Sequence, residues 1–180
     1  AGYGYTNDAG QSWTFPGVIE QGIFRSDPVL DADLDGNFYY NSLTFDGFAY
    51  TCKVFQSADG GISWDNGADA RGGDKQWMVI DKGEGIGSGN VYSSWTSDYS
   101  SCFPEFFTRS TDGGNYFESC VLVPGYPRWG TMAVGPDGEL YIVGQSEWSS
   151  LVIVKSTTAQ DPGASVSWVS SVDIYMDGYL

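Results

Sequence analysis

The chain has 180 residues, of which 41% are apolar and 16% aromatic, and its 8 basic and 23 acidic side chains give a formal charge of −15. This composition predicts a chain that folds around a core, and the negative charge argues against a nucleic-acid partner because it repels phosphate backbones. No apolar run of about 18 residues occurs, so no membrane span is expected.

The histidine and cysteine content excludes several kinds of catalytic and metal site. Histidine is absent, which removes the usual general base, the Ser-His triad and most zinc sites. The three cysteines, Cys52, Cys102 and Cys120, show no Cys-x-x-Cys spacing, so a zinc or iron–sulfur site is not expected. A single disulfide fits better, and Cys102 with Cys120 is the candidate pair because the two flank one predicted hairpin. The pairing stays open, since connectivity cannot be deduced from sequence.

A short phrase, Ser/Thr-x-Asp-x-Gly-x-x-aromatic, recurs along the chain at intervals of about 50 residues. Three copies match the phrase well, the first of them near the N-terminus, and a fourth copy is degenerate and has an enlarged turn. Its defining residues are Thr6, Asp8, Gly10 and Trp13; Ser57, Asp59, Gly61 and Trp64; Ser110, Asp112, Gly114 and Phe117; and, in the degenerate copy, Ser156 and Trp168.

A second pattern lies between these copies, at residues 28–40, 77–95 and 132–144. Each instance is an apolar run, a turn that contains glycine, and a second run rich in apolar and aromatic residues. Runs with period-two alternation and many Val, Ile, Tyr, Phe and Trp residues predict strands, and no stretch has a convincing helical period. Each repeat is therefore predicted to be two β-hairpins, the pattern of a four-stranded β-propeller blade.

The predicted fold class is all-β, a β-propeller of four-stranded antiparallel blades with about three and a half blades in this chain. Residues 1–180 are expected to be one propeller portion, with a half-blade at 3–19 and blades at 24–66, 74–123 and 128–172. Closed propellers need more blades, so a longer protein with exposed blade edges is expected. The four repeat aromatics, Trp13, Trp64, Phe117 and Trp168, are expected to be buried in equivalent positions.

The repeated phrase is the Asp box, and the chain resembles the bacterial neuraminidase repeat, or sialidase-like, propellers over nearly its whole length. The resemblance implies a structural role for the motif: the aspartate accepts backbone hydrogen bonds in the turn, the glycine permits a positive φ, and the aromatic residue packs into the blade. Asp8, Asp59 and Asp112 are therefore interpreted as fold residues and not as catalysts.

The same resemblance places a ligand site around the central axis, on the face opposite the Asp boxes. The segments that lead into the first strand of each blade supply the candidates for this face: Arg25, Asp27, Arg71, Asp74, Lys75, Trp77, Arg128 and Trp129. Exposed arginine and tryptophan at such a place fit carbohydrate contact, protein contact or solvated loops. The remaining arginine, Arg109, precedes an Asp box and is expected to pack or pair on its blade.

The alternative is an exo-sialidase or another glycoside hydrolase whose site is completed by further blades. Sialidases resemble one another in a Phe/Tyr-Arg-Ile/Leu-Pro segment, three arginines that grip a carboxylate, a Tyr-Glu pair and a catalytic Asp. Residues 24–28, FRSDP, keep the Phe-Arg opening, but Ser26 and Asp27 replace the single branched apolar residue. Asp27 is expected to pair with Arg25 and weaken its grip on an anion. No catalytic residue is assigned.

A metal signal lies at residues 31–37, DADLDGN. The spacing of Asp31, Asp33 and Asp35 with the glycine that follows is typical of the opening of a calcium loop. The alternative is an acidic Asp-Gly hairpin turn. Calcium is the candidate cofactor, although none is required.

The sequence therefore predicts a secreted or cell-surface bacterial protein that acts as a non-catalytic binding, adhesion or assembly module. Its expected partners are a glycan, a protein, or copies of itself through exposed blade edges. Neither a nucleic acid nor a membrane span is expected.

Overall fold

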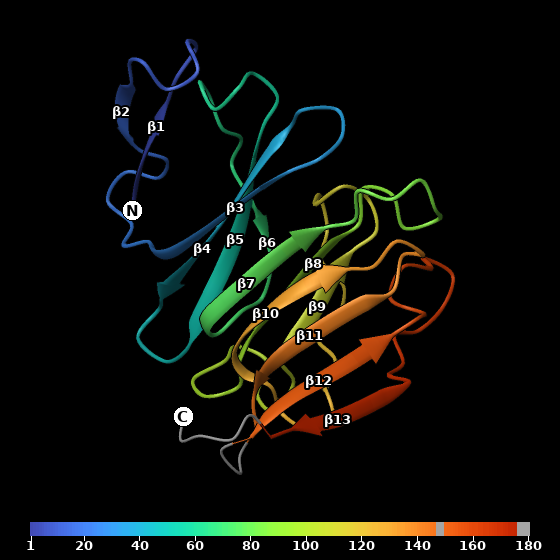
Figure 1. Cartoon of the computed structure of the whole chain (residues 1–180). Helices are drawn as coiled ribbons and strands as arrows, with labels where there is room; N and C mark the ends of the chain where they lie inside the picture. Colours follow the sequence, from blue (N-terminus) through green and yellow to red (C-terminus); the bar gives the residue numbers. More distant parts are fainter. Residues whose placement is uncertain (147–149, 176–180) are drawn as a thin grey trace.

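The protein is described by a computed structural model that covers residues 1–146 and 150–175 (Figure 1). Within these ranges the chain forms strands and no helix, which confirms the all-β prediction. The described residues therefore contain no helix long and apolar enough to cross a membrane. Each sheet consists of strands consecutive in sequence. The strands are β1 (Gly2–Tyr5) and β2 (Thr14–Val18); β3 (Ser26–Ala32), β4 (Phe38–Phe45), β5 (Tyr50–Ser57) and β6 (Ala68–Asp69); β7 (Asp74–Ile80), β8 (Val91–Thr96) and β9 (Phe107–Ser110); β10 (Arg128–Val134), β11 (Leu140–Gln145), β12 (Leu151–Ser156) and β13 (Ser170–Ile174).

All pairings within the four sheets are antiparallel. The three larger sheets pack face to face, and two apolar clusters fill the spaces between them. One cluster joins Tyr39 and Leu43 of β4 to Met78 and Ile80 of β7. The other joins the sheet β7–β9 to the sheet β10–β13, through residues that include Tyr92, Phe106, Phe107, Leu140, Ile142, Val152 and Val154. The sheet β7–β9 is therefore covered on both faces, and every residue of β8 is buried.

The first strands of the three larger sheets lie next to one another, with β7 between β3 and β10 (Figure 1). Side chains tie β3 to β7: Asp31 Oδ2 accepts the Ile80 N–H at 2.9 Å, and Asp31 Oδ1 pairs with Lys82 Nζ at 2.5 Å. These contacts hold the C-terminal ends of β3 and β7 together.

Arg109 ties the third sheet to the fourth. Its side chain is 3% exposed, and Nε pairs with Glu118 at 3.0 Å. The remaining guanidinium nitrogens donate to four backbone carbonyls of the turn after β12, those of Thr158, Ala159, Asp161 and Ala164. Burial of a charge is tolerated here because its donors are satisfied by carbonyl oxygens and one carboxylate.

The three good copies of the Asp box make the same hydrogen bonds. In the second copy, the Ser57 hydroxyl donates to Asp59 Oδ1 at 2.8 Å and accepts the Gly61 N–H at 2.9 Å, while Asp59 Oδ1 also accepts the Ser63 N–H at 2.9 Å. The first and third copies repeat this set. The glycines at the fifth position have φ of 87°, 83° and 85°, a region in which a Cβ is disfavoured.

The expected burial of all four repeat aromatics is wrong. Phe117 is buried at 1% exposure, Trp64 and Trp168 are half-buried, and Trp13 is 54% exposed. Phe117 belongs to the apolar cluster that it shares with Tyr39 and Val54 of the second sheet. Trp13 belongs to neither of the two apolar clusters.

The cysteines occupy two different environments. Cys102, in the loop before β9, is bonded to Cys120, in the segment after the third Asp box. Cys52 on β5 is a buried free thiol, and burial raises its pKa to about 12. Its sulfur is thus neutral and unreactive at neutral pH.

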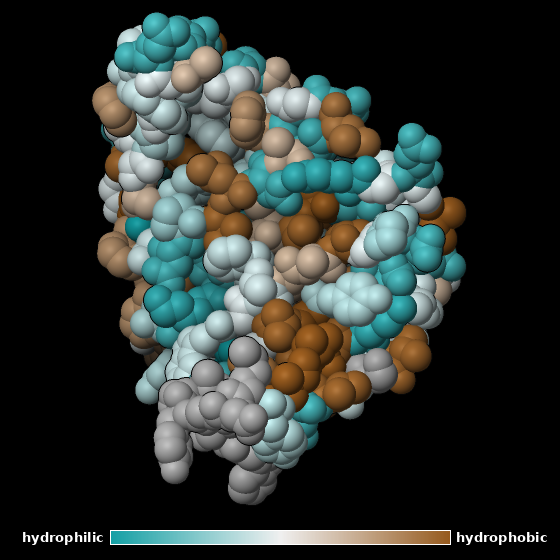
Figure 2. All heavy atoms as spheres, in the orientation of Figure 1, coloured by the Kyte–Doolittle hydropathy of each residue, from teal (hydrophilic) through white to brown (hydrophobic). Residues whose placement is uncertain are grey.

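The last sheet presents an apolar outer face. In β11 and β12, Ile142, Val152 and Val154 point to the core, whereas Val143 and Ile153, which pair across the two strands, lie on the opposite face. Figure 2 shows apolar surface gathered over this part of the molecule, bordered by hydrophilic residues.

The Asp boxes predict a specific acid sensitivity. Hydrogen bonds from the Ser63 hydroxyl and backbone N–H lower the pKa of Asp59 to about 2 from 3.8. Because the folded-state pKa is below the unfolded value, this carboxylate stabilises the fold above about pH 4, and the contribution is lost as the pH falls from 3.8 towards 2.

We expect Asp59→Asn to be less stable than the wild type at pH 6, with the difference in melting temperature shrinking as the pH falls from about 4 to about 2. Circular dichroism melts across this range measure it. Asp35→Asn, at an exposed aspartate outside the boxes, is the control. A difference independent of pH would contradict the assigned hydrogen bonds.

Candidate functional site

The strands β3, β7 and β10 all begin with the same irregularity. Each carries one extra residue relative to its partner strand, between Ser26 and Val29, between Asp74 and Trp77, and between Arg128 and Thr131. In each bulge the first inserted position has a positive φ although it is not glycine: 49° at Asp27, 55° at Lys75 and 46° at Trp129. A left-handed residue of this kind costs about 1–2 kcal/mol. Bulges and stored backbone strain are typical of functional sites.

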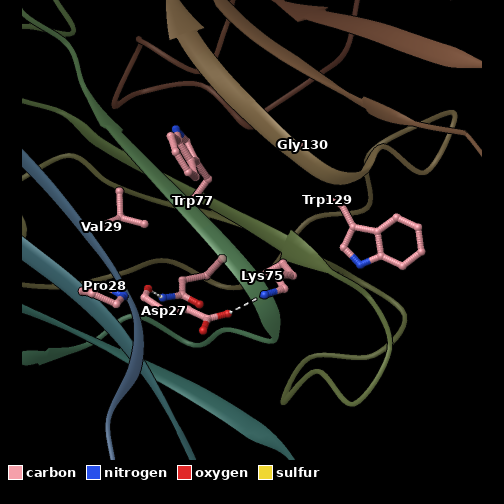
Figure 3. A pocket seen from close by; sticks show the side chains of 8 residues that line it. Asp27, Pro28, Val29, Lys75, Trp77, Trp129 and Gly130 are labelled. Atoms are coloured by element: carbon pink, nitrogen blue, oxygen red, sulfur yellow. Dashed lines mark hydrogen bonds and ion pairs between the residues drawn. The ribbon is translucent and has the colours of Figure 1, made fainter. Parts of the chain in front are cut away.

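A cavity of about 270 Å³ lies where the three bulges meet. We call it the axial cavity, and its walls come from all three strands (Figure 3). It is lined by Asp27, Pro28 and Val29 of β3, by Lys75, Gln76 and Trp77 of β7, and by Trp129 and Gly130 of β10.

Gln76 supplies a buried polar group to the axial cavity. Gln76 is 2% exposed, and its Nε2 donates a hydrogen bond to the Asp27 carbonyl. Within the described part of the chain its Oε1 has no hydrogen-bond partner. A buried acceptor without a donor costs about 1–3 kcal/mol, so a bound hydroxyl or amine would be stabilised there.

The charges at the axial cavity largely cancel. Lys75 Nζ lies 3.3 Å from Asp27 Oδ2, and Asp27 Oδ1 also accepts the Ser26 hydroxyl at 2.8 Å. The expected pairing of Asp27 with Arg25 is wrong, because the positive φ at Asp27 and the bulge direct this carboxylate towards β7. The pair leaves neither a free cation nor a free anion, which favours a neutral ligand.

Two indoles are available at the axial cavity. Trp77 is 40% exposed and Trp129 is 60% exposed. Figure 3 shows them projecting from the neighbouring strands β7 and β10, with the Asp27–Lys75 ion pair below them in that view. Exposed indoles present flat apolar faces that can stack on a ligand ring.

Four of the eight residues predicted for the ligand face therefore line this cavity: Asp27, Lys75, Trp77 and Trp129. Asp74 and Arg128 are the first residues of β7 and β10, directly before the bulges. Sequence analysis did not single out Pro28, Gln76 and Gly130. Alignment of the three strand starts would have indicated them, because each directly follows the left-handed residue of its bulge.

The three arginines of the enzyme alternative each contact a different carboxylate. Arg25, at 7% exposure, pairs with Glu20 at 2.5 Å and lies over the Phe55 ring at 5.3 Å. Arg71 lies 3.6 Å from Asp69. Arg128 lies 3.9 Å from Asp98. The axial cavity is lined by none of these arginines.

The acidic segment at residues 31–37 forms the turn between β3 and β4. Asp31 pairs with Lys82, whereas Asp33 accepts the backbone N–H groups of Asp35 and Asn37 at 3.0 and 2.9 Å. Partial burial acts to raise the pKa of Asp33, but these bonds and those from the Asn37 and Tyr39 side chains hold it below its ordinary value. In residues 1–146 and 150–175, no group of three or more His, Cys, Asp or Glu side chains could hold a metal ion. The carboxylates of Asp31 and Asp33 are thus held by other partners in this structure, Asp31 by Lys82 and Asp33 by the turn backbone.

Comparisons with known proteins show a similarity of fold alone. No family model matches the chain, and no curated protein matches it. A solved structure of a protein of unknown function from Dyadobacter fermentans is similar with a TM-score of 0.55 and 17% identity, over 89% of this chain and 55% of that chain. The chain thus spans about half the length of this similar structure.

The left-handed residues can be tested at Lys75. Glycine adopts a positive φ freely and valine does not, so Lys75→Gly is expected to be more stable than Lys75→Val by about 1–2 kcal/mol. Both variants lose the ion pair with Asp27, so that loss cancels in the comparison. Urea unfolding of the two variants gives the difference, and equal stability would contradict the bulge geometry.

Proposed function

We propose that this chain is part of an Asp-box β-propeller that binds a neutral glycan in the axial cavity and does not cleave it. The propeller interpretation is supported by separate antiparallel sheets of consecutive strands, by the adjacent first strands β3, β7 and β10, and by the Asp-box hydrogen bonds. In this arrangement the three bulges lie around the central axis.

The observation that carries the binding proposal is the buried, unpaired Oε1 of Gln76 beside two exposed indoles. A sugar ring has apolar C–H faces that stack on indole and hydroxyl groups that donate to such an acceptor. The volume of about 270 Å³ is near the lower end for ligand pockets, and it fits one ring better than a protein surface. The formal charge of −15 disfavours an acidic ligand.

The non-catalytic part of the proposal is supported by the titrating groups. A glycosidase needs a carboxyl group whose pKa is raised so that it can act as the acid. Among the described residues, every carboxyl group whose pKa departs from its ordinary value is shifted downwards, Glu20 and Asp33 included. The separate partners of Arg25, Arg71 and Arg128 also give no shared site for a sugar carboxylate.

We further propose that the protein works outside the cell or at its surface. The Cys102–Cys120 disulfide supports this, because disulfides persist in oxidising compartments.

Glycan binding is tested on an array of neutral and acidic glycans, followed by calorimetry with the best neutral ligand. We expect Trp129→Ala and Trp77→Ala each to weaken binding about tenfold, since each removes a stacking face. Trp13→Ala is the matched control, because Trp13 is also exposed and lies outside the axial cavity.

Two results would contradict the proposal. One is equal loss of binding in the Trp13→Ala control. The other is hydrolysis of a fluorogenic sialoside that disappears in Arg25→Ala, which would favour the sialidase alternative.

A further inference from the structure

A second group of aromatic rings lies at the same edge of the sheets as the axial cavity. It consists of Phe45 and Tyr50, on either side of the turn between β4 and β5, and Tyr99, in the loop between β8 and β9. We call these three residues the aromatic platform. Because β4 ends beside the start of β3, and β8 ends beside the start of β7, both connections lie at the end of the sheets that carries the bulges (Figure 1).

The three rings of the aromatic platform contact one another across two sheets. Phe45 and Tyr50 pair across β4 and β5, with ring centroids 5.1 Å apart, and the Tyr99 ring meets the Tyr50 ring edge-on at 6.3 Å. The Tyr50 N–H also donates to the Tyr99 carbonyl at 2.8 Å. The aromatic platform is thus one surface shared by the second and third sheets.

Tyr99 has a backbone conformation that tyrosine disfavours. It is the third residue of a turn that is closed by a hydrogen bond of 3.2 Å from the Ser100 N–H to the Ser97 carbonyl, and its φ is 57°. Glycine or asparagine suits such a position, so turn preference does not explain a tyrosine there. Burial does not explain it either, since Tyr99 is 71% exposed. Strained residues that the surrounding structure holds in place are typical of ligand contacts.

Ser100 fixes the loop that carries Tyr99. Its buried hydroxyl accepts the Trp95 indole N–H at 2.7 Å and the Cys102 N–H at 2.9 Å, and it donates to the Gly72 carbonyl at 3.2 Å. Cys102 is itself held by the disulfide. Because the loop is ordered before any ligand arrives, binding at Tyr99 costs less conformational entropy.

The loop also contacts the wall of the axial cavity. The Thr96 hydroxyl accepts the N–H of Trp129 at 3.4 Å, and Asp98 lies 3.9 Å from Arg128. Tyr99 follows Thr96 by three residues, which span at most about 11 Å. The aromatic platform therefore begins beside the Trp129 side of the cavity.

We propose that the aromatic platform is a second stacking site for the glycan of the axial cavity, so that the ligand is a neutral oligosaccharide and not a single sugar. This inference rests on the proposed function. One sugar ring occupies the axial cavity, and a later unit of the same chain stacks on Tyr99. Phenol rings offer flat apolar faces to sugar C–H groups, and their hydroxyls bond to sugar hydroxyls. Asp46 and Asp98, in the two connections that carry the platform, disfavour an acidic chain.

The length of the ligand tests the inference. The probes are neutral homo-oligosaccharides of one to six units from the cello-, chito-, xylo- and malto- series, titrated into the 180-residue protein by calorimetry. In a series that binds, we expect the affinity to rise at least about tenfold between one unit and the longer chains, because a second stacking contact is added.

A matched pair of variants locates the second stacking site. Tyr99→Asn removes the phenol ring and keeps a residue that tolerates a positive φ, so the loop is expected to stay folded. This variant is expected to lose the gain from chain length and to bind the single sugar as the wild type does. Tyr116→Asn is the control, because Tyr116 is 61% exposed and lies in the third Asp-box turn. Thermal melts of both variants show whether the fold is retained.

The outcomes separate this inference from the proposed function. If neither these probes nor the neutral glycans of the array bind, the proposed function fails and the inference fails with it. Binding that is weakened in Trp129→Ala but is independent of chain length overturns the second stacking site alone, and so does an unchanged gain with length in Tyr99→Asn. Self-association of the protein that Tyr99→Asn abolishes, without any effect of chain length on glycan affinity, would identify a protein contact and overturn the inference as well.

Discussion

The packing of neighbouring sheets through alternate side chains is the constraint on which the rest of the structure depends. Successive residues of a strand point to opposite faces, and β8 is buried on both: Val91 belongs to the cluster shared with the second sheet, and Tyr92 to the cluster shared with the fourth. A sheet covered in this way cannot slide by one residue without exposing its apolar set. Its first strand, β7, is consequently held between β3 and β10.

The fixed placement of β7 between β3 and β10 determines the shape and the lining of the axial cavity. Three bulges meet because three first strands meet, and the strain of Asp27, Lys75 and Trp129 is sustained by sheets that are anchored elsewhere. The anchors are Arg109, which binds the turn after β12, and Asp31, which joins β3 to β7. The same rigidity keeps the Gln76 acceptor in place although it has no hydrogen-bond partner among the described residues.

The two hollows of the molecule differ in their walls. The axial cavity is small, has polar groups and a neutralised ion pair, and is formed by the first strands of the three larger sheets. A second hollow, of about 450 Å³, lies between the hairpin β1–β2 and the sheet β3–β6 and is lined mostly by aromatic and apolar residues and glycines. Buried polar groups and an ion pair are thus found at the axial cavity, where three strand starts with bulges meet.

The sequence by itself determined the all-β class and where the Asp-box turns lie, because period-two alternation and the Ser-x-Asp-x-Gly phrase act within a few residues of each other. It also indicated Lys75, Trp77 and Trp129 as residues near one another, since they recur at equivalent strand starts. Only the tertiary structure decided the partners of the charged groups: Asp27 pairs with Lys75 and Arg25 with Glu20, although Asp27 and Arg25 are close in sequence. The exposure of Trp13 and the unpaired acceptor of Gln76 were decided in the same way. Side-chain pairing and burial depend on which strands lie side by side, and strands from distant parts of the chain meet only when the sheets pack.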